Sequence, residues 1–167
     1  MGTIETAISE LTRTSQDMAP AIEALGRATT SPTPGEGQTV QQMQAWSLRA
    51  ARAFKEPAER VSEIGERMFN TTKELDVDMQ RLRRIAVELS SVSPDFAASY
   101  NTMINQLAGI DVVSAQLDEL LVKMKPAEYL SVALRKSLRP ARRGLTRITD
   151  SLHLIETWQP IEVAISE

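Results

Sequence analysis

Apolar side chains recur every three to four residues along the first part of the chain. Between Ile4 and Leu25, six of the seven positions on this row are apolar, which is the pattern of one stripe of a helix. Pro20 lies off the stripe and should bend the helix, because proline removes one backbone hydrogen bond. The pattern predicts an N-terminal helix over residues 1–28.

A second apolar row runs from residue 39 to residue 89 and keeps its phase through Pro57. This favours one continuous helix with a kink at the proline. The alternative is a new helix starting there, since proline suits the first helical position and Glu59 would face the positive end of the dipole. In the favoured interpretation, residues 39–56 extend the helix that continues to residue 91.

Two more long rows follow, at residues 94–124 and 126–158. Ser93 and Pro94 are good residues for a helix start, and Pro126-Ala127-Glu128 is interpreted as a hairpin. Long helices of similar length joined by short loops favour antiparallel neighbours. The sequence therefore predicts an all-α antiparallel bundle of three to four long, proline-kinked amphipathic helices.

Composition between these rows predicts the domain organisation. Residues 29–38 hold two prolines, two glycines and no large apolar side chain, which is typical of a flexible linker. We expect a single domain overall: the helix 1–28, this linker, a long-helix bundle over 39–158 and an extended tail over 159–167.

The tail differs from the helices in its spacing. Ile161, Val163 and Ile165 alternate at period two, and Ile and Val favour extended backbone. A strand has no partner in an all-α bundle, so these three residues are candidates for pairing with the sheet edge of a binding partner. The alternatives are a frayed end or a cut inside a longer protein.

Few residues suited to catalysis or metal binding are present. The 167 residues include no cysteine and one histidine, His153. Zinc and di-iron sites need several Cys or His ligands, which this chain does not have. A Ser-His-Asp triad could use only His153 as its base. We expect no enzyme activity, no cofactor and no small-molecule substrate. The net charge of −3 also argues against a nucleic-acid partner.

One charged segment stands out. No acid occurs between Tyr129 and Thr149, and on a helix the opposite side of this segment is apolar. Its basic residues are candidates for binding an acidic partner or an anionic membrane surface: Arg135, Lys136, Arg139, Arg142, Arg143 and Arg147. The plainer alternative, which we favour, is that this face balances acidic neighbours, because the window lacks the Trp or Phe of an interfacial helix.

These features predict a non-catalytic scaffold, adaptor or oligomerising module that acts through protein–protein contacts of its helix faces. Self-association or a helical partner is expected, because apolar stripes this long often bury more than an isolated three-helix unit can cover. The alternative is a peripheral module that uses the basic face 135–147. No apolar run is long enough to span a membrane, and without cysteine or a signal peptide we expect a cytoplasmic protein. Gly2 and Thr6 match a short myristoylation pattern, which leaves N-terminal lipidation open.

Overall fold

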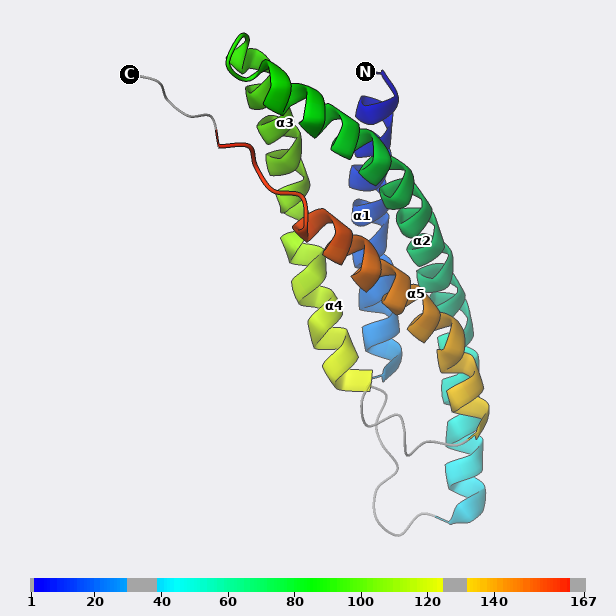
Figure 1. Cartoon of the computed structure of the whole chain (residues 1–167). Helices are drawn as coiled ribbons and strands as arrows, with labels where there is room; N and C mark the ends of the chain where they lie inside the picture. The colour runs from blue at the N-terminus through cyan, green and yellow to red at the C-terminus, as the bar shows by residue number, and fades with distance from the viewer. Residues whose placement is uncertain (1, 30–38, 125–131, 163–167) are drawn as a thin grey trace.

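The computed structural model of the chain describes residues 2–29, 39–124 and 132–162. Within these ranges the backbone is mostly helical and contains no strand (Figure 1), which confirms the predicted all-α fold class. The elements are α1 (Gly2–Thr29), α2 (Val40–Leu89), α3 (Pro94–Leu107), a 3-10 turn η1 (Ala108–Ile110), α4 (Asp111–Met124) and α5 (Val132–Glu156).

Local sequence explains where α2 and α3 begin. Thr39 forms a capping box with Gln42: the Gln42 N–H donates to the Thr39 hydroxyl, and the Thr39 N–H donates to Gln42 Oε1. α3 begins at Pro94, as predicted. Ser93 precedes it in extended backbone, but its side chain makes no capping hydrogen bond, so the fixed φ of proline is what suits this start.

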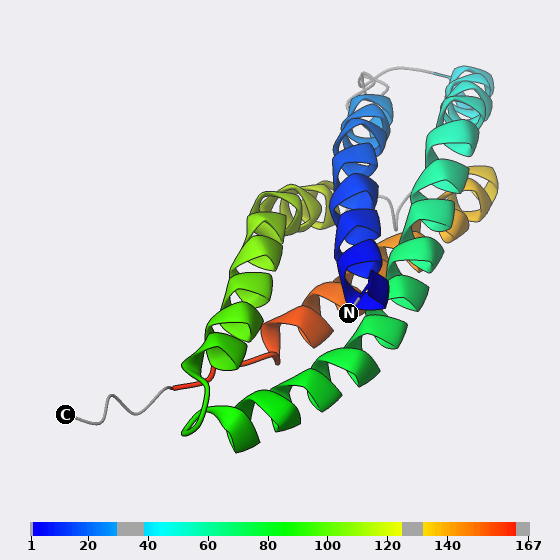
Figure 2. The same ribbon diagram turned by 90° about the horizontal axis from the view of Figure 1, so that it is seen from above.

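α2 passes through Pro57 without interruption, which confirms the continuous helix. Figure 2 shows α2 as one long, curved helix. α1 and α5 likewise contain Pro20 and Pro140 in their interiors. These three prolines therefore lie within helices and do not divide them.

The single helix predicted over 94–124 is wrong. The chain breaks it at η1 into α3 and α4, and Figure 2 shows α4 turning away from the direction of α3. Gly109 stands at the break and favours it, because glycine is a poor helix former. Asp111 then supplies an acid in the first turn of α4. The apolar row kept its phase across this turn, so periodicity alone did not reveal it.

Other predicted boundaries are only partly described. α1 ends at Thr29 and Thr39 caps α2, so nearly all of the predicted linker 29–38 lies outside the described residues. The hairpin at 126–128 lies outside them too. α5 ends at Glu156, two residues before the predicted end at 158.

Successive long segments run in opposite directions: α1 down, α2 up, α3 and α4 down, α5 up in the view of Figure 1. The antiparallel order along the chain is thus confirmed. The most extensive packing, however, joins α2 to α5, which run parallel. Arg147 of α5 contacts Glu66 of α2, and Trp158, which follows α5, contacts Asp76 of α2. The residue numbers differ by 81 in the first pair and by 82 in the second, as expected for two helices that run in the same direction.

The core fills the space between the helices, and the predicted stripes are largely covered within one chain. Buried hydroxyls inside it are satisfied by the preceding turn: Ser15 donates to the Leu11 carbonyl at 2.8 Å and Thr72 to the Met68 carbonyl at 2.7 Å. Exposed large apolar residues are spread over several helices. The largest fully buried side chains are Tyr100, Leu11, Met18, Leu25, Met68, Leu75, Met79, Leu107, Leu117, Leu134, Leu145 and Ile148.

Candidate interaction surface

The predicted basic residues all lie on α5, and five of the six lie away from its apolar stripe. Leu134, Leu138 and Ile148 are buried against the bundle. Five basic side chains are exposed to solvent, as the pattern predicted: Arg135, Lys136, Arg139, Arg142 and Arg143. Arg139, Arg142 and Arg143 form no ion pair with a described residue, so neighbouring acids do not neutralise them directly.

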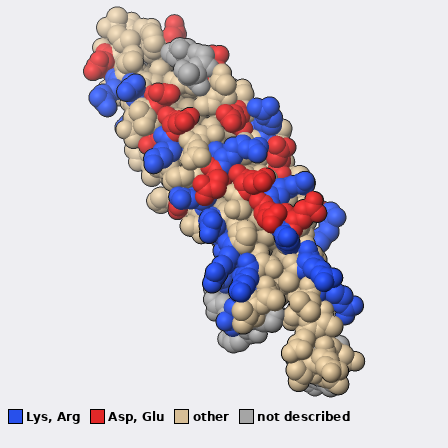
Figure 3. All heavy atoms as spheres, turned by 90° about the vertical axis from the view of Figure 1, so that its right-hand side faces the viewer, with Lys and Arg blue, Asp and Glu red and all other residues tan. Residues whose placement is uncertain are grey.

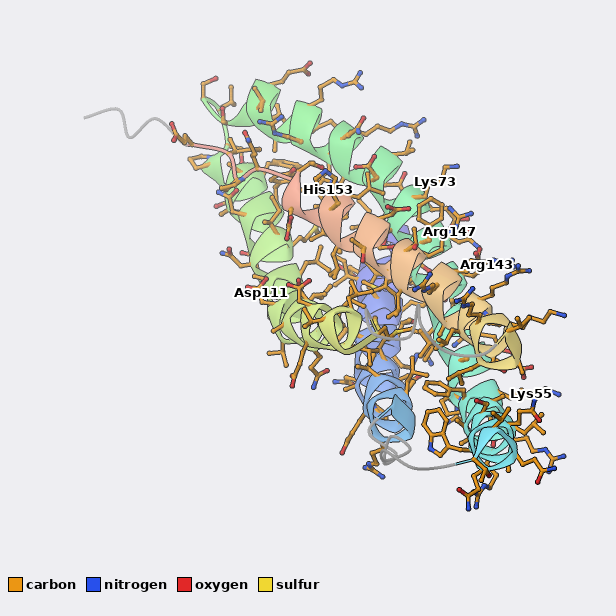
Figure 4. The ribbon with its side chains drawn as sticks, turned by 90° about the horizontal axis from the view of Figure 1, so that it is seen from below. Lys55, Lys73, Asp111, Arg143, Arg147 and His153 are labelled. Atoms are coloured by element: carbon orange, nitrogen blue, oxygen red, sulfur yellow. The ribbon has the colours of Figure 1, made fainter. Side chains whose placement is uncertain are left out.

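Arg147 has a different environment from the other five. Its Nε lies 3.2 Å from Glu66 Oε1, and its guanidinium carbon lies 4.4 Å from the centre of the Phe69 ring. Figure 4 shows Arg147 on the side where α5 meets α2. Arg147 therefore helps to join these helices, and for this residue the charge-balancing interpretation is correct.

The parallel packing brings a second basic segment to the same end of the molecule. α2 has no acid between Val40 and Lys55, and Arg49, Arg52 and Lys55 are exposed there. Arg147 of α5 pairs with Glu66 of α2 at an offset of 81 residues, so α5 starts near Lys55 of α2. The acid-free segment of α5 therefore begins where that of α2 ends, and the two follow one another along the molecule (Figure 1). Sequence reasoning missed these three residues because the offset between α2 and α5, which brings the two segments together, leaves no signal in the sequence.

We call residues 40–55 of α2 together with 132–147 of α5 the basic end. It holds nine of the chain's 19 Lys and Arg residues and none of its 22 Asp and Glu residues. Figure 3 shows basic side chains flanking the lower part of the molecule, whereas acidic and basic side chains mix above. Figure 4 shows Lys55 and Arg143 extending to the same side. A chain of net charge −3 thus carries a strongly positive end.

The C-terminal segment packs on its own bundle, which corrects the prediction for Ile161. This side chain is 8% exposed, and the Asn101 side chain accepts from its N–H at 2.8 Å and donates to its carbonyl at 3.2 Å. Its backbone therefore needs no partner strand. The side-chain amide of Asn101 supplies both partners, which spacing along the tail does not reveal. Val163 and Ile165 lie outside the described residues, and strand addition there stays a prediction.

Trp158 anchors the same segment. It is 7% exposed, and its indole N–H donates to Asp76 Oδ1 at 2.6 Å.

Tyr100 lies near this contact, and its pKa is raised above the ordinary value, mainly because the side chain is buried. The Arg83 guanidinium lowers this pKa and the Asp76 carboxylate raises it, both by smaller amounts than burial does. Tyr100 and Trp158 line one shallow pocket of about 380 Å³ together with Arg83 and Arg84.

Chemistry other than charge is sparse in the described part of the chain. His153 is exposed on α5 (labelled in Figure 4). Among the residues described, no three His, Cys, Asp or Glu side chains cluster closely enough to bind a metal ion. None of the helices seen here is both long and apolar enough to cross a membrane.

Comparison of the chain with protein-family models, curated proteins and solved structures finds no match.

Proposed function

We propose that the protein is a non-catalytic helical-bundle adaptor that binds an anionic partner through its basic end. The observation that carries this proposal is the parallel packing of α2 and α5, which places two acid-free segments with nine cations one after the other along the same part of the molecule. Clustered charge of one sign attracts an oppositely charged partner and speeds its association. Self-association has less support, because one chain covers most of its own apolar stripes.

A charge-reversal experiment tests this surface. Retention of the intact protein on immobilised polyglutamate is measured as salt is raised. The double variant Arg139→Glu/Arg143→Glu should elute at clearly lower salt than the wild type, because both side chains are exposed at the basic end. Circular dichroism should show unchanged helicity.

The matched control is Arg81→Glu/Arg84→Glu. These residues are exposed on α2 outside the basic end, and the change in net charge is identical. If the control loses as much retention as Arg139→Glu/Arg143→Glu, net charge governs binding and the basic end is not a contact surface. Equal retention of the wild type and the α5 variant would also contradict the proposal.

A further inference from the structure

The basic end carries exposed apolar side chains among its cations. Val40, Leu48 and Val132 are 70%, 54% and 67% exposed. Trp46 is half-buried and packs against the core from the same part of α2. The α5 segment lacks an aromatic residue, and Trp46 is the one partly exposed aromatic residue in the described part of the basic end.

The first turns of α2 extend past the core. No described side chain between Val40 and Arg49 is buried, and Ala50 is the first buried residue of the helix. Figure 1 shows this part of α2, in cyan, projecting beyond the start of α5. The capping box at Thr39 holds the projecting end in helical form. The molecule thus presents a short helical projection with cations, Trp46 and Leu48.

We propose that the basic end docks on an anionic phospholipid surface. This inference rests on the proposed function and names the partner's chemistry. Exposed Lys and Arg side chains of α2 and α5 face the negatively charged headgroups, and Leu48 enters the boundary between headgroups and acyl chains. Each cation near such a surface adds to the attraction, so two helices bind more strongly than one.

The shape of this end favours a membrane over an acidic protein. Recognition of a protein segment often uses a groove or pocket, and three pockets of the described structure, beside Ile22, Ile8 and Tyr100, lie away from the basic end. An anionic bilayer presents a broad charged surface, which a protein can bind without a groove. Exposed Lys and Arg side chains can contact its headgroups while the apolar side chains between them insert.

Vesicle sedimentation tests the inference with the full chain. Vesicles of phosphatidylcholine mixed with phosphatidylserine should bind the wild type, and vesicles of phosphatidylcholine alone should not. Arg49→Glu/Arg52→Glu and Arg139→Glu/Arg143→Glu should each lower the bound fraction roughly tenfold or more, whereas Arg81→Glu/Arg84→Glu should change it little. Leu48→Ser should weaken vesicle binding while leaving polyglutamate retention unchanged, since it alters no charge.

Fluorescence adds a readout of insertion. Brominated lipids should quench the wild-type protein, and the quenching should disappear in Trp46→Phe, because the other tryptophan, Trp158, is buried beside Asp76. Retention on polyglutamate without vesicle binding would overturn the lipid inference and leave the proposed function standing, with an acidic protein as the partner. Loss of both interactions would overturn both. Binding to neutral vesicles as strong as to anionic ones would also contradict a charge-based mechanism.

Discussion

Gly65 of α2 and Gly144 of α5 face each other backbone to backbone where the two parallel helices cross. A β-carbon built on Gly65 would lie 2.7 Å from Gly144 Cα, and one built on Gly144 would lie 2.7 Å from Ser62 Cα. Both distances are too short for any side chain, so this crossing requires glycine on both helices. The same crossing fixes where the basic segment of α5 lies along α2.

Replacement of either glycine by alanine should destabilise the fold. Gly65→Ala or Gly144→Ala forces backbone away from backbone, and we expect a loss of about 1–3 kcal/mol in the free energy of unfolding, measured in urea. Gly26→Ala is the control, because a β-carbon there meets nothing within 4 Å. That change should be neutral or stabilising by up to about 1 kcal/mol. Similar effects at all three positions would show that helix propensity, not crowding, dominates.

The hydrogen bond between Trp158 and Asp76 should fasten the end of α5 to α2. Asp76→Ala leaves a buried indole N–H without its acceptor, and we expect a loss of about 1–3 kcal/mol. Asp78→Ala makes the same chemical change two residues away. Asp78 is similarly half-buried and bonds to no described residue, so the cost there should stay below about 0.5 kcal/mol. Thermal unfolding of the two variants tests this difference.

Asn101 should hold the residues after Trp158 against the bundle. Asn101→Ala removes both hydrogen bonds to Ile161 and should cost about 1 kcal/mol. Hydrogen exchange at the Ile161 amide should accelerate, whereas the exposed Asn105→Ala should leave it unchanged. Deletion of 161–167 should also lower stability, because Ile161 is buried. A deletion with full stability would show that this contact contributes nothing.

The predicted core positions Leu107 and Leu117 are indeed buried, at 1% and 2% exposure. Truncation of either to alanine should cost about 2–5 kcal/mol, because the bundle cannot close the cavity that remains. Val122→Ala is a control in α4, where that side chain is 66% exposed and should contribute under about 0.5 kcal/mol. Urea unfolding midpoints compare the three variants, and equal shifts would contradict the assignment of the buried stripe.

The sequence predicted the helices well because each apolar stripe is a local property of its own segment. The start at Pro94 and the continuity of α2 through Pro57 were predicted for the same reason. The break at Gly109 was not, since the residues on either side kept the phase of one stripe. A short turn can pass without a visible change in periodicity.

Contacts between segments far apart in the chain could not be predicted from the apolar periodicity. The basic residues of α5 were predicted, whereas Arg49, Arg52 and Lys55 join them because α2 and α5 pack directly against each other in this register. The close packing of the two helices requires Gly65 and Gly144, two small residues about 80 positions apart. The Asn101 contact with Ile161 likewise joins residues 60 positions apart. Such pairs leave no periodic signal in one sequence.

Tyr100 should make stability depend on pH in the alkaline range. Its pKa in the folded state is raised above the ordinary value of 10.0, mainly by burial, so the folded protein binds the phenolic proton more tightly than the unfolded chain. The contribution is complete below pH 10 and is lost as pH rises from there through the folded-state pKa. Tyr100→Phe cannot ionise, so its free energy of unfolding should fall less between pH 8 and pH 11 than that of the wild type. Urea titrations at the two pH values measure the difference, and lysines contribute equally to both proteins. Identical alkaline losses would mean that the phenol ionises as readily in the folded state as in the unfolded chain.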